Sequence, residues 1–454
     1  MGIMQQWNQQ ELNFGGKGMN RPEPGSEMPI TSWLSEDPTG SSQLMEMVCE
    51  RQNMRRALHR VLRNKGAPGI DGMTVEQLSG YLRRHWSKIE TDLLAGRYGP
   101  LPVRRKDIDK PEGGIRPLGI PTVLDRLIQQ AMAQVLERIW EHTFSESSFG
   151  FRPRRSAHDA IRQCKRFVET GYRHVVDIDL EKFFDRVNHD RLMSRLATRV
   201  HDKRALKLIR RFLTCGVMIG GLVSPTDEGT PQGGPLSPML SNIVLDELDK
   251  ELERRGLHFV RYADDCVIYV RSKRAGERVM QSITRFITRR LKLRVNEAKS
   301  SVTHPWWSKY LGFSFTGTRG DTRIRIHSKT MKRFKRRIRE LTARERGRGI
   351  GQIMVELNRY LRGWWGYFAL SETRSWLPSV NGWIIRRLRA YIWKQWKLPR
   401  TKVRELIRRG VPKYWAVKVG NTRKGAWRLS KNVTVRMAMP NRYFTASLGL
   451  VLLG

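Results

Sequence analysis

Cysteine is scarce in this sequence of 454 residues, and the four cysteines lie far apart, at Cys49, Cys164, Cys215 and Cys266. No two of them form a C-x-x-C pair, which argues against a zinc ribbon and against a fold held by disulfides. Long apolar runs are also missing, because none reaches the roughly 18 residues of a membrane-spanning helix. The first residues lack the positive segment and apolar core of a signal peptide. We therefore expect a cytoplasmic protein with no membrane segment.

Negative charge is the other shortage. The chain has 43 Asp and Glu against 85 Lys and Arg, which gives a formal net charge of +42 and a sequence pI of about 11.0. Such a chain needs an anionic partner, and without apolar runs a nucleic acid is favoured over a membrane surface. Lys and Arg that neutralise phosphates release counterions and so give strong, salt-sensitive binding.

Two β-rich runs meet at neighbouring carboxylates in residues 259–270. Branched and aromatic residues on both sides favour strands, and the Ala-Asp-Asp interruption favours a turn between them. Only a bend lets Asp264 and Asp265 point to one place, because adjacent side chains of a strand face opposite ways. Two carboxylates this near to each other repel unless a cation lies between them. The pattern indicates a divalent metal site; the alternative is a surface turn, where Asp is common.

A second acidic strand end lies upstream, in residues 174–185. Asp177 and Asp179 alternate there with apolar residues, and Asp179 comes at the end of the expected strand. With the hairpin aspartates it gives three carboxylates from two strands, the kind of oxygen ligand that Mg²⁺ takes when it shares substrate phosphates. Two such ions about 3.5–4 Å apart activate an attacking hydroxyl and stabilise the leaving oxygen. The pattern therefore indicates nucleotidyl transfer.

Three motifs together resemble a known family. They are Tyr262-Ala-Asp-Asp265, Asp179 with Phe184 five residues on, and Thr230-Pro-Gln-Gly-Gly-Pro-Leu-Ser-Pro238. Their order and spacing resemble the successive motifs of reverse transcriptases, and the finer wording is most similar to the bacterial group II intron-encoded reverse transcriptase/maturases of the group IIC type. The paired cysteines and other motifs of the endonuclease domain that many relatives carry are missing here.

The resemblance implies an α/β (α+β) fold of the right-hand polymerase type. We expect a flexible N-terminal extension in residues 1–40, reverse transcriptase fingers and palm in 41–325, a helical thumb or maturase domain in 326–398, and a small basic DNA-binding region in 399–454. Apolar stripes at helical spacing support three helices in the thumb. The aromatic residues of that region are more readily explained as core than as platforms for bases.

The resemblance also implies the roles of the acidic residues. Asp179, Asp264 and Asp265 are expected to be catalytic and to hold two Mg²⁺ ions, with Mn²⁺ as the alternative ion. Ile178 and Leu180, the neighbours of Asp179, belong to the same expected metal site.

The resemblance also implies which residues contact the nucleotide. Lys110 and Arg116, near the two ends of a hairpin in residues 104–121, are on this ground expected to reach the triphosphate, and Gln232 to lie beside the incoming nucleotide. Phe184 is expected to pack under the sugar and so to exclude a 2′-hydroxyl, although it could equally be a core residue. Lys299 is the candidate proton donor to the leaving pyrophosphate.

Template and RNA contacts are expected at three arginines, Arg55, Arg104 and Arg152. Arg55 belongs to an expected helix in residues 44–61 with basic residues on its polar faces. Arg offers bidentate geometry to phosphates, while a solvated basic face is the alternative explanation.

The motifs, together with the family resemblance, imply an RNA-directed DNA polymerase that also binds intron RNA as a maturase and supports retrohoming. Its expected partners are group II intron RNA, an RNA template with a DNA or RNA primer, target DNA and deoxynucleoside triphosphates. Two alternatives stay open: a non-catalytic RNA-binding splicing factor, and an intron-free reverse transcriptase recruited to DNA repair or defence. The sequence predicts no oligomeric state.

Overall fold

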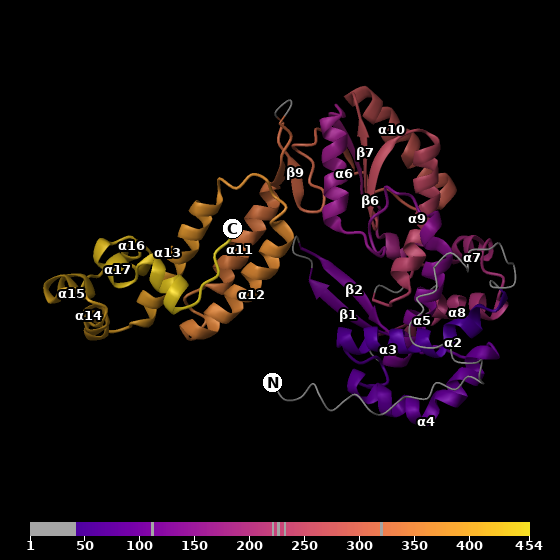
Figure 1. Ribbon diagram of the computed structural model, residues 1–454, viewed down its shortest axis with the longest axis horizontal. Coiled ribbons are helices and arrows are strands. Elements are labelled where there is room, and N and C mark those ends of the chain that lie inside the picture. Colours follow the sequence, from indigo (N-terminus) through magenta and orange to yellow (C-terminus); the bar gives the residue numbers. More distant parts are fainter. Residues whose placement is uncertain (1–41, 110–112, 220–221, 225–227, 231–232, 318–320) are drawn as a thin grey trace, which may run out of the picture. The chain divides into compact units, whose positions relative to one another are not determined.

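The computed structural model describes residues 42–454 except 110–112, 220–221, 225–227, 231–232 and 318–320. The chain forms two compact units. The first comprises residues up to 163 together with 172–303, and the second comprises residues 164–171 and 304–454. Both units mix helices and strands (Figure 1), so the expected α/β class is confirmed.

An antiparallel sheet organises the first unit, with strand order β6-β7-β3-β8. Its strands are short runs of branched and aromatic residues, as the sequence predicts. They are β3 His174–Ile178, β6 His258–Tyr262, β7 Asp265–Val270 and β8 Ser301–Thr303. A second sheet, of order β2-β1-β4-β5, contains β1 Val103–Asp109, β2 Ile115–Ile120, β4 Val217–Ile219 and β5 Leu222–Ser224.

This unit also contains α-helices. They are α2 Leu44–Cys49, α3 Arg51–Asn64, α4 Val75–Leu94, α5 Val123–Trp140, α7 His189–Ala197, α8 Lys203–Thr214, α9 Ser237–Arg254 and α10 Lys273–Phe286. Helix α6, Ala157–Glu169, spans the boundary between the units. Gly276 lets α10 approach the sheet closely, since an added Cβ there would lie 2.6 Å from a methyl carbon of Val302.

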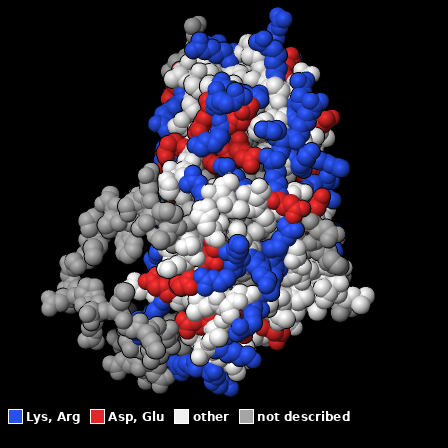
Figure 2. All heavy atoms as spheres, turned by 90° about the vertical axis from the view of Figure 1, so that its right-hand side faces the viewer, with Lys and Arg blue, Asp and Glu red and all other residues white. Residues whose placement is uncertain are grey.

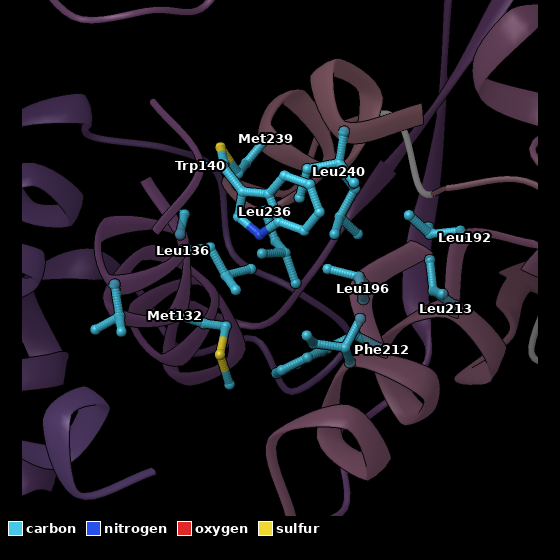
Figure 3. Packing of buried hydrophobic residues seen from close by; sticks show 14 of the residues in the cluster. Met132, Leu136, Trp140, Leu192, Leu196, Phe212, Leu213, Leu236, Met239 and Leu240 are labelled. Carbon is cyan, nitrogen blue, oxygen red and sulfur yellow. The ribbon is translucent and has the colours of Figure 1, made fainter. Parts of the chain in front are cut away.

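The core of the first unit is apolar and continuous. Figure 3 shows the Trp140 side chain, which is fully buried, among leucines and methionines of α5, α7 and the start of α9. Burial of such large side chains is the main stabilising contribution to a unit of this size. The core thus holds the helices of the unit against one another.

The second unit is mainly helical and has its own core. A two-stranded sheet of β9 Phe313–Phe315 and β10 Ile324–Ile326 precedes its helices. The helices are α11 Ser328–Leu341, α12 Ile350–Phe368, α13 Leu377–Gln395, α14 Pro399–Arg408, α15 Lys413–Gly420, α16 Ala426–Leu429 and α17 Val433–Ala438. The apolar stripes expected in α11 to α13 are buried, as at Phe334, Leu361 and Leu388. Most of this compact unit lies in residues 304–454, and the expected thumb boundary after residue 325 stays a prediction.

Charged side chains are numerous on the face of the molecule that Figure 2 shows. On the face shown, Lys and Arg are spread from end to end, with Asp and Glu lying among them. Several of these groups form ion pairs, for example Arg254 with Glu251 and Arg210 with Asp190. Exposed pairs of this kind each contribute about 0–1 kcal/mol, so the charge matters more for partners than for stability.

Candidate active site

The hairpin of β6 and β7 carries two of the expected catalytic residues. Tyr262 pairs with Asp265, which leaves only Ala263 and Asp264 in the loop. Two-residue hairpin loops need a positive φ, and Ala263 has a φ of +56°. That conformation is unfavourable for a residue with a Cβ, so the tip of the hairpin is strained at the residue before Asp264.

Asp179 reaches the same place through the register of the sheet. The last residue of β3, Ile178, lies opposite Cys266 of β7, so the next position along brings Asp179 opposite Asp265. The backbone of Asp179 is held from a third segment: its N–H donates to Ser300 Oγ (3.1 Å), and its carbonyl accepts from Asn296 N (2.8 Å). The structure therefore brings the three expected aspartates together at one end of the sheet, where β3 stops and β7 starts.

The carboxylates influence one another electrostatically. The pKa of Asp264 is raised, mainly by burial and further by Asp179, while Arg116 lowers it in part. Burial, together with Asp265 and Asp179, raises the pKa of Asp177 to about 7. Asp177 is thus a fourth carboxylate near this end of the sheet. It was not among the expected site residues, although it alternates with apolar residues in β3. A cation would relieve the repulsion between these groups.

The donor set suits a hard divalent cation. Among the described residues no group of three or more His, Cys, Asp or Glu side chains is ready to hold a metal ion by itself. Mg²⁺ commonly takes only one or two carboxylates and completes its shell with water and substrate phosphates. These mutually repelling carboxylates therefore suit divalent metal ions that bind together with a nucleotide.

Lys299 lies beside the same end of the sheet. Its Nζ is 4.0 Å from Asp179 Oδ2, and 67% of its side chain is exposed. Ile178 and Leu180, on either side of Asp179, are both buried. Only their backbone groups can therefore contribute to a metal site, since their apolar side chains offer no ligand.

A cavity of about 570 Å³ contains the expected nucleotide-binding residues that the structure describes. Arg116 and Phe184 line it, whereas the adjacent Phe183 is buried in the core. Gly233 and Gly234 form part of its wall, and a Cβ at Gly233 would lie 2.6 Å from a backbone oxygen. A cavity of this size accommodates a small-molecule ligand. Lys110 and Gln232 lie outside the described residues.

Phe151 is a lining residue that the sequence reasoning missed. Its ring is 53% exposed, it lines the same cavity as Phe184, and its φ is +59°. A strained, exposed aromatic residue is characteristic of functional sites. The surrounding Phe-Gly-Phe-Arg-Pro sequence, rich in turn residues, was the available signal.

The expected template-binding arginines have different environments. Arg55 is exposed on α3, and Arg104 is half-buried on β1. Arg152 is buried: it pairs with Glu141 and donates to the carbonyls of Ser145 (2.5 Å) and Ser148 (3.0 Å). These internal partners occupy its guanidinium, so the structure does not support a nucleic-acid contact through Arg152.

A second cavity, of about 770 Å³, lies where such a contact has better candidates. Carboxylates and arginines together line it. The arginines are Arg56, Arg60, Arg138, Arg154 and Arg155. Arg154, two residues after Arg152, is exposed, and an exposed guanidinium offers bidentate geometry to a phosphate.

Comparisons with known proteins agree with this geometry. Residues 108–315 match the family model described as reverse transcriptase (RNA-dependent DNA polymerase), and residues 331–414 match the group II intron maturase-specific domain. Protein YkfC of Escherichia coli K12 is 34% identical over 316 residues, which cover 61% of this chain and 83% of that protein. The group II intron-encoded protein LtrA of Lactococcus lactis is 32% identical over 336 residues, or 60% of this chain and 56% of LtrA. A putative COX1/OXI3 intron 2 protein of Saccharomyces cerevisiae is 32% identical over 221 residues, which cover 48% of this chain and 25% of that protein.

The chain thus spans most of YkfC and about half of LtrA. In the part of the chain that the structure describes, no helix is both long and apolar enough to cross a membrane.

Proposed function

Because the chain belongs to the family of group II intron-encoded reverse transcriptases and maturases and is an RNA-directed DNA polymerase, we propose that its chemistry takes place at Asp179, Asp264 and Asp265. In this proposal a primer 3′-hydroxyl attacks the α-phosphate of a deoxynucleoside triphosphate paired to an RNA template. Pyrophosphate leaves. The single observation that carries the proposal is the gathering of the three aspartates at one end of the sheet.

The family uses divalent metal ions, and two Mg²⁺ ions are the proposed cofactors here, with Mn²⁺ as the alternative. When bound, the ions would neutralise phosphate charge and favour the deprotonated hydroxyl. Asp179 and Asp264 would hold both ions, and Asp265 would complete the acidic set. The backbone of Asp179 donates to Ser300 Oγ and accepts from Asn296 N, so little reorganisation is needed when substrate arrives.

The remaining side chains bind and orient the nucleotide. Arg116 contributes positive charge near Asp264, with Lys110 and Gln232 as further proposed contacts. The Phe184 ring would lie under the sugar and collide with a 2′-hydroxyl. Lys299, whose ammonium lies beside Asp179, would give a proton to the departing pyrophosphate.

An Asp264→Asn variant tests this proposal. Primer extension on an RNA template should fall by about 10²–10³-fold or more, because a carboxylate that would hold the metal ions is lost and with it their stabilisation of the developing negative charge. The control is Asp190→Asn, which removes an exposed carboxylate on α7 with 83% of its side chain accessible and should extend primers at the wild-type rate. An Asp264→Asn protein that extends primers as fast as the wild type would remove the proposal.

Binding of intron RNA is a second proposed role of the same chain. The match of residues 331–414 to the maturase-specific domain favours it, as do the exposed basic residues on α11, such as Arg333 and Arg336. Added protein should then allow the intron to splice at a Mg²⁺ concentration where the RNA alone does not. Unchanged splicing would count against this role.

The other proposed partners are target DNA, met through the basic region after residue 399, and an RNA or DNA primer, all in the bacterial cytoplasm. An intron-free relative recruited to repair or defence is the competing proposal. It predicts that the coding region lies outside any intron RNA, which inspection of the flanking DNA decides.

A further inference from the structure

Arg261 is an unusual residue to find next to the hairpin tip. It lies in β6, directly before Tyr262, and its side chain and that of Asp249 on α9 are both 0% exposed. Moving an ion pair out of water costs several kcal/mol per charge, before the attraction between the two charges is counted. Apolar side chains packed at the same place would avoid this cost. A charge kept there needs a reason beyond filling space.

All five N–H groups of the Arg261 guanidinium find acceptors. Two bonds reach Asp249, from Nε to Oδ1 (2.7 Å) and from Nη2 to Oδ2 (2.5 Å). Nη1 donates to Asn242 Oδ1 (3.0 Å) and Nη2 to Ser148 Oγ (2.8 Å). The fifth bond goes from Nη1 to the carbonyl of Ala263 (2.9 Å). The guanidinium therefore links α9, the segment before α6 and the hairpin tip.

The fifth bond acts on the peptide group that joins Ala263 to Asp264. Holding this carbonyl sets the orientation of that peptide plane, and hence the direction in which the Cα–Cβ bond of Asp264 points. The hold is needed because Ala263 has a positive φ of +56°, a conformation that costs about 1–2 kcal/mol for a residue with a Cβ.

Residues 147–150 close the other side of the tip. The backbone of Arg261 exchanges bonds with this segment, from Arg261 N to Ser147 O (2.9 Å) and from Phe149 N to Arg261 O (2.9 Å). Gly150 touches the tip so closely that an added Cβ would lie 2.2 Å from Ala263 N. Asn242 fixes this glycine as well, by donating from Nδ2 to its carbonyl (2.9 Å).

We propose that Arg261 is a positioning residue for the polymerase reaction: anchored to α9 by Asp249, it holds the Ala263 carbonyl and so aims the Asp264 carboxylate at the reacting phosphates. This inference rests on the proposed catalytic role of Asp264. A lysine could keep the charge beside Asp249 but has no planar fork to bridge four separate acceptor groups.

An Arg261→Lys variant of the full chain tests the inference. We expect kcat for RNA-templated extension to fall by about 10–100-fold, because a small misplacement of a reacting group has effects of that order. The KM for the deoxynucleotide should stay within about 2-fold, because Arg116 and Phe184 in the cavity are untouched, and half-maximal rate should require more Mg²⁺. Rates are expressed per folded molecule, measured by circular dichroism.

Two further variants separate positioning from stability. Asn242→Ala leaves the ion pair intact but removes one acceptor of the guanidinium and the donor to the Gly150 carbonyl, and should lower kcat by about 10-fold with the same unchanged KM. Arg389→Lys is the matched control, because Arg389 is a buried arginine of the second unit that donates to the Met439 and Ser430 carbonyls. It should lower the melting temperature without changing kcat or the Mg²⁺ requirement.

The outcomes are distinguishable. If Asp264→Asn is as active as the wild type, the proposed function fails and the inference fails with it. If Asp264→Asn is inactive but folded Arg261→Lys and Asn242→Ala both keep the wild-type kcat and Mg²⁺ dependence, only the inference is overturned. Loss of kcat in both variants, with an unchanged KM, supports it even if Arg261→Lys also melts earlier.

Discussion

At the scale of single residues, Phe183 and Phe184 differ although they are neighbours. Phe183 is 2% exposed in the core, while Phe184 lines the cavity that Arg116 also lines. Their rings meet edge to face, with centroids 5.2 Å apart. Of the two neighbouring rings, only the Phe184 ring lines the cavity.

Replacing Phe184 with alanine should weaken sugar discrimination. Without the ring a 2′-hydroxyl no longer collides, so the preference for deoxynucleotides over ribonucleotides should fall by about 10–100-fold, the range that a change in pocket shape achieves. Primer extension with each nucleotide type measures this ratio.

The matched control is Phe183→Leu. It should destabilise the fold by about 1–3 kcal/mol and leave the ratio unchanged. Equal discrimination in the Phe184→Ala and wild-type proteins would mean that Phe184 does not contact the sugar.

At the scale of elements, Asp202 joins the starts of two helices. Its Oδ1 accepts from Arg204 N (2.9 Å) and Ala205 N (3.4 Å) at the start of α8, and its Oδ2 accepts from Met45 N (3.0 Å) in α2. Arg204 also pairs with it through the side chain. One buried carboxylate therefore satisfies N–H groups of helices that are distant in the sequence.

This arrangement predicts a pH-dependent stability. Burial acts to raise the pKa of Asp202, but hydrogen bonds from Arg204 and Met45 outweigh it and lower the pKa from its ordinary 3.8. A lowered folded-state pKa means that the stabilisation is complete above about pH 3.8 and is lost as the pH falls below that value. Asp202→Asn should cost about 1–3 kcal/mol at pH 7, and the difference from wild type should shrink below pH 3.8. Urea unfolding at several pH values measures it, with Asp190→Asn as the neutral control.

The residues after Tyr443 form another such connection, within the second unit. Asn358 of α12 donates to Gly449 O (2.8 Å) and accepts from Val451 N (3.0 Å). Asn381 of α13 likewise donates to Leu453 O (2.9 Å) and accepts from Leu453 N (3.1 Å). Leu450 and Leu453 are buried, so this apolar segment completes the core of the unit.

Changing both asparagines to alanine should release the segment. The backbone amides of residues 451 and 453 would lose their acceptors, at a cost of about 1–3 kcal/mol for each pair of bonds. Hydrogen exchange at these amides should therefore speed up strongly. Asn421→Ala, at an exposed position in the same unit, should leave their exchange unchanged; protection that survives the double change would show that burial alone retains the segment.

At the scale of the whole molecule, the excess of 42 positive charges is the dominant property. The ion pairs described above use up some basic groups, but Lys and Arg outnumber Asp and Glu by 85 to 43. Such an excess of one sign favours a polyanionic partner.

RNA affinity should accordingly depend steeply on salt. Six to ten phosphate contacts would lower the binding constant by about 10³–10⁵ between 50 and 200 mM salt. Filter binding across this range gives the slope, and Arg154→Ala should reduce it by about one contact. A binding constant that does not change with salt would exclude a phosphate-dominated interface.

Much of this protein follows from its sequence alone. The aspartates, Phe184 and the apolar stripes of α11 to α13 are visible there because short motifs and helical periodicity are local properties of the chain. The family assignment rests on the same motifs, and the comparisons confirm it.

Other features depend on residues that only folding brings together. Arg152 is an expected RNA contact but lies in the interior, where its guanidinium donates hydrogen bonds to Glu141 and to two backbone carbonyls. Arg261 is paired with Asp249 inside the protein, and nothing in the sequence predicts that pairing. Whether a charged side chain meets solvent, a ligand or a buried partner is decided by the tertiary structure, since the energy of a charge depends on what surrounds it in space.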